Sequence, residues 1–194
     1  MLVRHAEEML RWNRSIRLTA ITAPEEVAVK HILDSLLLLS VAPFPGRTLD
    51  FGSGAGYPGI PLAVALPDAQ VVLLESSAKK CAFLSHACAL LGLRNAVVVR
   101  GRLEPRNPLP LGPFERIVTR ATLSPPEAAR LLVPYLLPEG CLLLMTGPGE
   151  AVRRPPRGRP EKELPPGARH GRRLPFTLPF GMGVREIREI LAGP

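Results

Sequence analysis

The feature that most constrains the fold is an alternation of short apolar runs with helical segments, which begins at residue 47. Most of these runs are rich in Val, Leu or Ile, a composition typical of strands buried on both faces of a sheet. The segments between them, near residues 59–66, 77–91 and 125–136, have helical composition. This order predicts an α/β fold with a mostly parallel sheet, right-handed crossovers and flanking helices. The expected strands span residues 47–51, 70–75, 96–100, 114–119 and 141–145.

Residues 1–41 precede this core and predict a short N-terminal helical extension. Thr22 and Glu25 have the spacing of a capping box, which predicts that a helix starts with Thr22 as its cap. Beyond Glu25, pairs of apolar residues recur every four positions, as on the buried face of a helix. We therefore expect helices rather than strands ahead of the sheet.

The chain changes character again after the fifth expected strand. Residues 151–173 hold five prolines and eight basic residues, which predicts a loop or insert rather than a packed element. Residues 174–194 return to apolar character and are expected to close the sheet as a final hairpin, with residues 184–191 as its last strand. A length of 194 residues fits one domain, with a cofactor-binding core at residues 47–147.

A glycine-rich turn, Asp50-Phe-Gly-Ser-Gly-Ala-Gly-Tyr-Pro-Gly59, leaves the first expected strand and enters a helix. Glycines let the backbone approach a ligand closely, and the start of a helix offers unpaired N–H groups. Glu75 ends the second expected strand, nineteen residues after Gly56. A carboxylate at this place can accept hydrogen bonds from both ribose hydroxyls of an adenosine-containing ligand.

Two classes of cofactor match this turn. Gly54, Gly56 and Gly59 have the spacing of the dinucleotide fingerprint, which keeps an NAD(P)-dependent oxidoreductase as an alternative. Asp50 favours S-adenosyl-L-methionine, because a carboxylate repels a pyrophosphate but tolerates a ligand with a sulfonium and an amino group. The turn therefore predicts a methyltransferase.

Other features exclude several classes of protein. Three cysteines without C-x-x-C spacing argue against a disulfide framework and a zinc site, and they predict a reducing, cytoplasmic environment. His86 and His170 have no carboxylate or cysteine at ligand spacing, so no metal is expected. The longest apolar run, residues 36–39, is far too short to span a membrane.

Seven blocks of the chain resemble a known family, and together they span residues 12–147. The blocks are Trp12-Asn13, Leu18-Thr19, Lys30-His-Ile-Leu-Asp-Ser35, Asp50 to Pro61, Leu74 to Leu84, Gly101-Arg-Leu-Glu104 and Thr119-Arg-Ala121. Their order is similar to that in the bacterial small-subunit rRNA guanine-N7 methyltransferases, also called glucose-inhibited division protein B. The resemblance implies a class I, Rossmann-like methyltransferase fold and methyl transfer to N7 of a guanine in 16S rRNA.

The resemblance also implies which residues meet the cofactor. Gly52 and Tyr57 would lie beside its methionine moiety, Glu75 would hold the ribose, and Leu103 and Glu104 would border the adenine. Arg120 would stand where cofactor and substrate meet and position both, without acting as a general acid or base. With the residues of the turn, the expected cofactor site comprises Asp50, Gly52, Gly54, Gly56, Tyr57, Glu75, Leu103, Glu104 and Arg120.

Candidates for contact with RNA fall in three places. His31, Asp34 and Ser35 belong to a block that the family places near the mouth of the site, and helix packing explains them equally well. Lys79 and Lys80 open a helix, where a solvated first turn is the favoured interpretation over phosphate binding. Arg153 and Arg154 belong to the basic insert, which carries a net charge of +6 out of +8 for the chain.

The chemistry that the resemblance implies needs few residues. Guanine N7 carries no proton, so alignment of the reacting atoms and exclusion of water suffice, with no general base. Ser124-Pro-Pro-Glu127 partly matches a motif of amino-group methyltransferases, but it lacks the aromatic residue, and capping of a helix explains it.

We expect a cytoplasmic, monomeric protein whose partners are 16S rRNA or the 30S subunit, with no membrane and no metal involved. A second alternative is a catalytically impaired homologue that binds cofactor or RNA in a regulatory role. Two departures from the family pattern support this alternative: only eleven residues precede Trp12, and Thr146-Gly147 stands where the family tends to have Lys-Gly.

Overall fold

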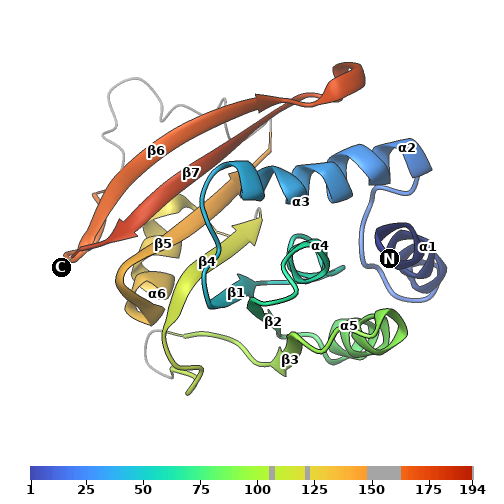
Figure 1. Ribbon diagram of the computed structural model, residues 1–194, viewed down its shortest axis with the longest axis horizontal. Coiled ribbons are helices and arrows are strands. Elements are labelled where there is room, and N and C mark those ends of the chain that lie inside the picture. The colour runs from blue at the N-terminus through green and yellow to red at the C-terminus, as the bar shows by residue number, and fades with distance from the viewer. Residues whose placement is uncertain (105–107, 121–122, 148–162, 194) are drawn as a thin grey trace.

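A computed structural model describes residues 1–104, 108–120, 123–147 and 163–193. Its centre is a seven-stranded sheet with the order β3-β2-β1-β4-β5-β7-β6. The first five strands in this order are parallel, and β7 runs antiparallel to both β5 and β6 (Figure 1). The strands are β1 Arg47–Phe51, β2 Gln70–Glu75, β3 Ala96–Arg100, β4 Phe114–Arg120, β5 Leu136–Thr146, β6 Ala168–Thr177 and β7 Val184–Ala192. The predicted parallel α/β core is therefore confirmed.

Helices cover both faces of the sheet. Alternate residues of each strand face opposite ways, so Leu73 packs with α1, α4 and α5 whereas Leu74 packs with α6. The helical stretch before β1 covers the same face as α4, where Leu38 meets Leu62 and Leu143. The helices are α1 Leu2–Asn13, α2 Pro24–Val27, α3 Asp34–Leu36, α4 Gly59–Ala65, α5 Ala78–Leu91 and α6 Pro125–Leu132.

The helical stretch before β1 changes its winding along its length. A π-helical segment, Ala28–Leu33, joins α2 to α3, and a 3₁₀ turn, Leu37–Ser40, ends the stretch. The expected cap at Thr22 is wrong, because α2 begins at Pro24 with Ala23 as its N-cap. Thr22 thus precedes the cap position by one residue, and its hydroxyl does not cap the helix. π-Helical turns often occur at functional sites, and this one carries His31.

The C-terminal hairpin closes the sheet as expected, and it is longer than the sequence indicates. β6 starts at Ala168, so the expected boundary of the insert at residue 173 falls inside this strand. The last strand, β7, is confirmed. Arg153 and Arg154 lie outside the described residues.

Two further observations concern exclusions. Cys81, Cys88 and Cys141 are free and buried. Within the described part of the chain, every helix is too short or too polar to traverse a bilayer.

Candidate cofactor and substrate site

Two cavities open at the carboxyl ends of the parallel strands. The first has a volume of about 210 Å³ and is lined by Gly52, Glu75 and Arg102, among others. The second has a volume of about 310 Å³ and includes His31 and Arg120 in its lining. The first cavity follows β1, β2 and β3, and the second follows β4 and β5. They lie on either side of the point between β1 and β4 where the chain order of the sheet reverses, which is where open α/β sheets bind ligands.

The glycine-rich turn is packed too closely for side chains at two of its positions. A Cβ atom on Gly59 would lie 2.2 Å from Leu73 Cδ2 and 2.5 Å from Asp50 Oδ2. Gly56 has φ of +86°, and a Cβ atom there would lie 2.6 Å from Ile60 Cδ1. The third and fourth glycines of the turn therefore fix how tightly α4 approaches β1.

Asp50 is buried at the end of β1, with 1% of its surface exposed. Its Oδ2 accepts a hydrogen bond from the Gly59 N–H at 3.0 Å, and its Oδ1 has no partner among the described residues. Burial raises the pKa of Asp50 to about 7. An unpartnered buried oxygen is costly, which makes Asp50 a natural acceptor for a donor group of a ligand.

Glu75 is held in place by the backbone around it. Its Oε2 accepts from the Gly54 N–H at 3.1 Å, and its Oε1 accepts from the Ser77 N–H at 2.8 Å. A carboxylate has about four acceptor sites, so these bonds orient Glu75 and leave capacity for a ligand. Because Glu75 lines the 210 Å³ cavity, its carboxylate suits a ribose diol.

The candidate residues that follow β3 and begin α5 lie in three different environments: the cavity, the core and the solvent. Gly101 and Arg102 line the cavity, whereas Leu103 is 4% exposed and packs into the core beside α6. Glu104 is exposed just beyond it. In the first turn of α5, Lys79 is exposed and Lys80 is half-buried.

Tyr57 contacts two histidine rings. The centre of the His5 ring lies 4.6 Å from that of Tyr57 with the planes tilted, and the His31 ring stacks on Tyr57 at 4.6 Å. His5 also bonds through Nε2 to the Ala55 carbonyl at 3.0 Å, so α1 holds the glycine-rich turn directly. Burial lowers the pKa of His5 to about 4, which keeps this ring neutral. His5 is not predictable from the sequence, because it belongs to no motif.

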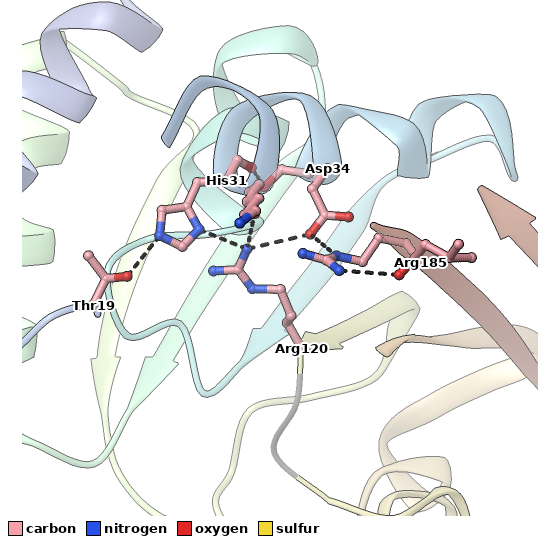
Figure 2. Close-up of polar contacts among 8 residues, drawn as sticks. Thr19, His31, Asp34, Arg120 and Arg185 are labelled. Carbon is pink, nitrogen blue, oxygen red and sulfur yellow. Dashed lines mark hydrogen bonds and ion pairs between the residues drawn. The ribbon is translucent and has the colours of Figure 1, made fainter. Parts of the chain in front are cut away.

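His31 and Arg120 form the centre of the second cavity (Figure 2). Arg120 Nη1 donates to His31 Nδ1 at 3.1 Å, and His31 Nε2 lies 2.9 Å from the Thr19 hydroxyl. Since a guanidinium has no acceptor, this bond requires an unprotonated Nδ1 and places the proton of His31 on Nε2. Burial, with a smaller contribution from Arg120, lowers the pKa of His31 to about 3. His31 is therefore a neutral ring that orients Arg120.

Asp34 joins two arginines from different strands, Arg120 of β4 and Arg185 of β7 (Figure 2). Its Oδ2 lies 3.7 Å from Arg120 Nη1 and 3.4 Å from Arg185 Nε. Arg185 belongs to β7 and was not among the candidates, because a lone arginine in a strand has no signature. Ser35 has a different role: its hydroxyl donates to the His31 carbonyl at 2.6 Å, within the helix.

Two of the family-like blocks explain how Thr19 reaches His31. The Asn13 side chain accepts from the N–H groups of Leu18 and Thr19 at 2.8 and 3.0 Å, and it donates to the Thr19 carbonyl at 3.0 Å. These bonds fold the loop after α1 back over the cavity. Within α1, Trp12 donates to Glu8 at 2.9 Å, and the same Glu8 carboxylate lies 2.9 Å from His86 Nε2 of α5, which links the two helices.

The residues present fit S-adenosylmethionine. Glu75 faces one cavity with acceptor oxygens for hydroxyls, and Asp50 and Tyr57 present buried polar atoms that have no partner among the described residues. Arg120, whose guanidinium lies 5.8 Å from the Tyr57 ring centre, connects this region to the second cavity. Among the described residues, no group of three or more His, Cys, Asp and Glu side chains could hold a metal ion.

Comparisons with known proteins agree on one family. Residues 1–152 match the family model described as rRNA small subunit methyltransferase G. The chain is 37% identical to Ribosomal RNA small subunit methyltransferase G of Geobacter sulfurreducens, over 95% of the chain and 84% of that relative. It is 44% identical to the protein of the same name in Anaeromyxobacter dehalogenans, over 76% of the chain and 68% of the relative.

Among solved structures, the fold is similar to that of a SAM dependent methyltransferase from Aquifex aeolicus. The TM-score is 0.64 at 15% identity, over 96% of this chain and 98% of that one. At this identity the likeness concerns the fold alone.

Proposed function

The chain belongs to the rRNA small subunit methyltransferase G family, and on that premise we propose that it methylates N7 of a guanine in 16S rRNA. The protein is an S-adenosylmethionine-dependent rRNA methyltransferase. The observation that carries the finer proposal is the pair of cavities on either side of the sheet's switch point, with Arg120 in the lining of the second. One cavity suits an adenosine, and the other has room for a base.

For the cofactor, we propose that Glu75 holds the ribose and that Gly101 and Arg102 border the adenine. Gly52, Gly54 and Gly56 let the backbone pass close to the ligand, with Asp50 and Tyr57 near the methionine part. The position of Leu103 in the core supports a role behind the adenine site, and Glu104 at the surface borders it. When bound, the cofactor supplies an electrophilic methyl group.

For the substrate, we propose that the 310 Å³ cavity receives the guanine. Arg120 is held by His31 and by Asp34, so its guanidinium keeps one orientation without a ligand. Guanine O6 lies next to N7 and is an acceptor that arginine commonly binds, so a hydrogen bond from Arg120 to O6 would hold the base while the N7 lone pair stays free to attack the methyl carbon. Arg120 thus positions the base, and neither His31 nor Asp34 needs to move a proton, because N7 carries none.

The remaining candidates are proposed to contact the substrate outside the cavity. Lys79 and Lys80 lie at the start of α5, next to the Glu75 side of the site, where phosphate groups of rRNA would pass. Arg153 and Arg154 belong to the basic segment outside the described residues. We propose that the enzyme acts in the cytoplasm on 16S rRNA or the 30S subunit, as a monomer whose 194 residues form one domain.

Methyl transfer from labelled S-adenosylmethionine to 30S subunits that lack the modification tests this function. We expect one labelled nucleotide in 16S rRNA, with chain cleavage at 7-methylguanine after reduction and aniline treatment. Glu75→Gln should raise the KM for the cofactor, and Arg120→Ala should mainly lower kcat. Folded enzyme that binds the cofactor but leaves rRNA unlabelled would contradict the proposal and favour a regulatory role.

A further inference from the structure

The turn between β6 and β7 carries an aromatic side chain in solvent. Phe180 is 86% exposed and is the only aromatic residue among the large exposed hydrophobic residues of the described chain. Its φ of 57° lies in the left-handed region, which bulky residues rarely adopt. Leu178 anchors the turn, since it is 1% exposed and its N–H donates to the Gly183 carbonyl at 2.9 Å. The turn is therefore anchored at Leu178 while the side chain of Phe180 faces solvent. Packing within the protein does not explain this exposure.

The register of the sheet places this turn at the end of the strands where the two cavities open. Thr146, the last residue of β5, pairs with Glu186 near the start of β7. The turn before β7 therefore lies at the edge where the parallel strands end, as Figure 1 shows. Arg185 lines the 310 Å³ cavity and is five residues from Phe180, a separation of at most roughly 17 Å along an extended backbone.

The charge of the hairpin suits a polyanion. Residues 168–192 contain five arginines and two glutamates. Both glutamates bind arginine: Glu189 accepts from Arg172, and Glu186 accepts from Arg188. The hairpin therefore carries a net positive charge. Arg185, which pairs with Asp34, is the arginine nearest to Phe180 in the sequence, and Arg169, Arg172 and Arg173 follow β6 away from the turn. Proteins that bind single-stranded RNA combine these two elements, because arginines follow the phosphates while an aromatic ring stacks on an unpaired base.

We propose that Phe180 stacks on an rRNA base a few nucleotides from the target guanine, which makes the β6–β7 hairpin an RNA-contacting arm. The inference rests on the proposed function. A protein partner would need a broader apolar patch, whereas the large exposed hydrophobic residues of this hairpin are only Phe180 and Val184 within the described chain. The positive charge and the small apolar area together favour a nucleotide.

Steady-state methylation of 30S subunits by variants of the full chain tests the arm. Phe180→Ala should raise the KM for 30S subunits about fivefold or more, with unchanged affinity for S-adenosylmethionine and unchanged kcat. Phe180→Trp should keep the wild-type KM, because it retains a stacking face. Val97→Ala is the matched control: it also removes an exposed apolar side chain, 58% exposed, from β3 at the opposite edge of the sheet.

A photoreactive residue identifies what the ring contacts. With p-benzoylphenylalanine at position 180, we expect a cross-link to 16S rRNA in the complex with 30S subunits. A cross-link to a ribosomal protein or to a second copy of the chain would overturn the proposal, as would an unchanged KM for Phe180→Ala. Failure of the proposed function would look different, since the wild-type enzyme would then transfer no methyl group to rRNA.

Discussion

At the scale of single residues, Gly59 matters because no larger side chain fits at its position. Gly59→Ala would push a methyl group against Leu73 and the carboxylate of Asp50. Overpacking of this kind costs about 1 to 3 kcal/mol of unfolding free energy, and we expect the upper part of this range because both neighbours are buried. Urea denaturation would measure the loss, and calorimetry should show weaker cofactor binding.

Gly147→Ala is the matched control for this substitution. Its Cβ atom would have no described neighbour within 4 Å, and its φ is not positive. We expect its urea midpoint to equal that of the wild type. If both variants were equally stable, close packing at Gly59 would not be the reason for the glycine.

His5 predicts a loss of stability in mild acid. Burial lowers its pKa from 6.5 to about 4, so below pH 6.5 the unfolded chain takes up a proton that the folded chain does not. Its contribution to stability is therefore full above pH 6.5 and falls as the pH drops towards 4. Between pH 6.5 and 5.0, His5→Gln should lose about 1.5 kcal/mol less unfolding free energy than the wild type. Parallel stability curves for the two proteins would contradict the buried, neutral ring.

At the scale of elements, the residues at the start of α6 could either cap the helix or belong to a catalytic motif, and a substitution distinguishes the two roles. Ser124 and Glu127 form the predicted capping box, in which the Ser124 N–H donates to the Glu127 carboxylate at 3.1 Å. Ser124→Ala should lower the unfolding free energy by about 1 kcal/mol while methyl transfer per folded molecule stays unchanged. Ser85→Ala, at an exposed position inside α5, should instead raise stability by a few tenths of a kcal/mol. A fall in kcat for Ser124→Ala would point to a catalytic role.

Elements were predictable where local pattern determines them. Strand runs such as Gln70–Glu75 are apolar and flanked by breakers, and the structure has the same bounds. The cap at Thr22 was wrong by one residue because Pro24 can occupy the first turn of the helix without losing a hydrogen bond. The basic composition of residues 168–173 predicts that they belong to the insert, yet pairing with β7 makes them part of a strand. This pairing depends on tertiary structure, so the local sequence does not reveal it.

At the scale of the whole molecule, the site was predictable only in part. The glycine-rich turn and Glu75 have fixed spacings, so their meeting follows from the order of strand, turn and helix. His5 and Arg185 reach the site from the two ends of the chain, and only the complete packing brings them there. Residues that reach the site only through long-range packing cannot be predicted from local sequence patterns, although they orient the residues that those patterns do predict.

The distribution of charge predicts how RNA binding depends on salt. Replacing Arg153, Arg154, Arg157 and Arg159 with glutamine removes four positive charges from the basic insert. Each lost phosphate contact reduces the slope of log K against log salt by about 0.7 to 0.9, so the slope for 30S binding should fall by up to about 3. Affinity for S-adenosylmethionine should not change.

Arg94→Gln serves as the control, because Arg94 is exposed just before β3, at the opposite end of the strands. We expect its salt slope to match that of the wild type. An unchanged slope for the fourfold variant would mean that the insert does not meet phosphate, and that its basic residues have no part in binding the ribosome.

Because β6 is an edge strand, its side chains affect how readily the protein aggregates. An outer strand offers unpaired backbone groups to any other strand, and proline, charged side chains and an irregular register are the usual protection against aggregation. β6 has all three, in Pro175, in Arg169 and Arg173, and in the break in pairing between His170 and Arg173. Neutral β-branched replacements in this strand would therefore promote precipitation, and glutamine or lysine is the safer choice for variants made to weaken RNA contacts.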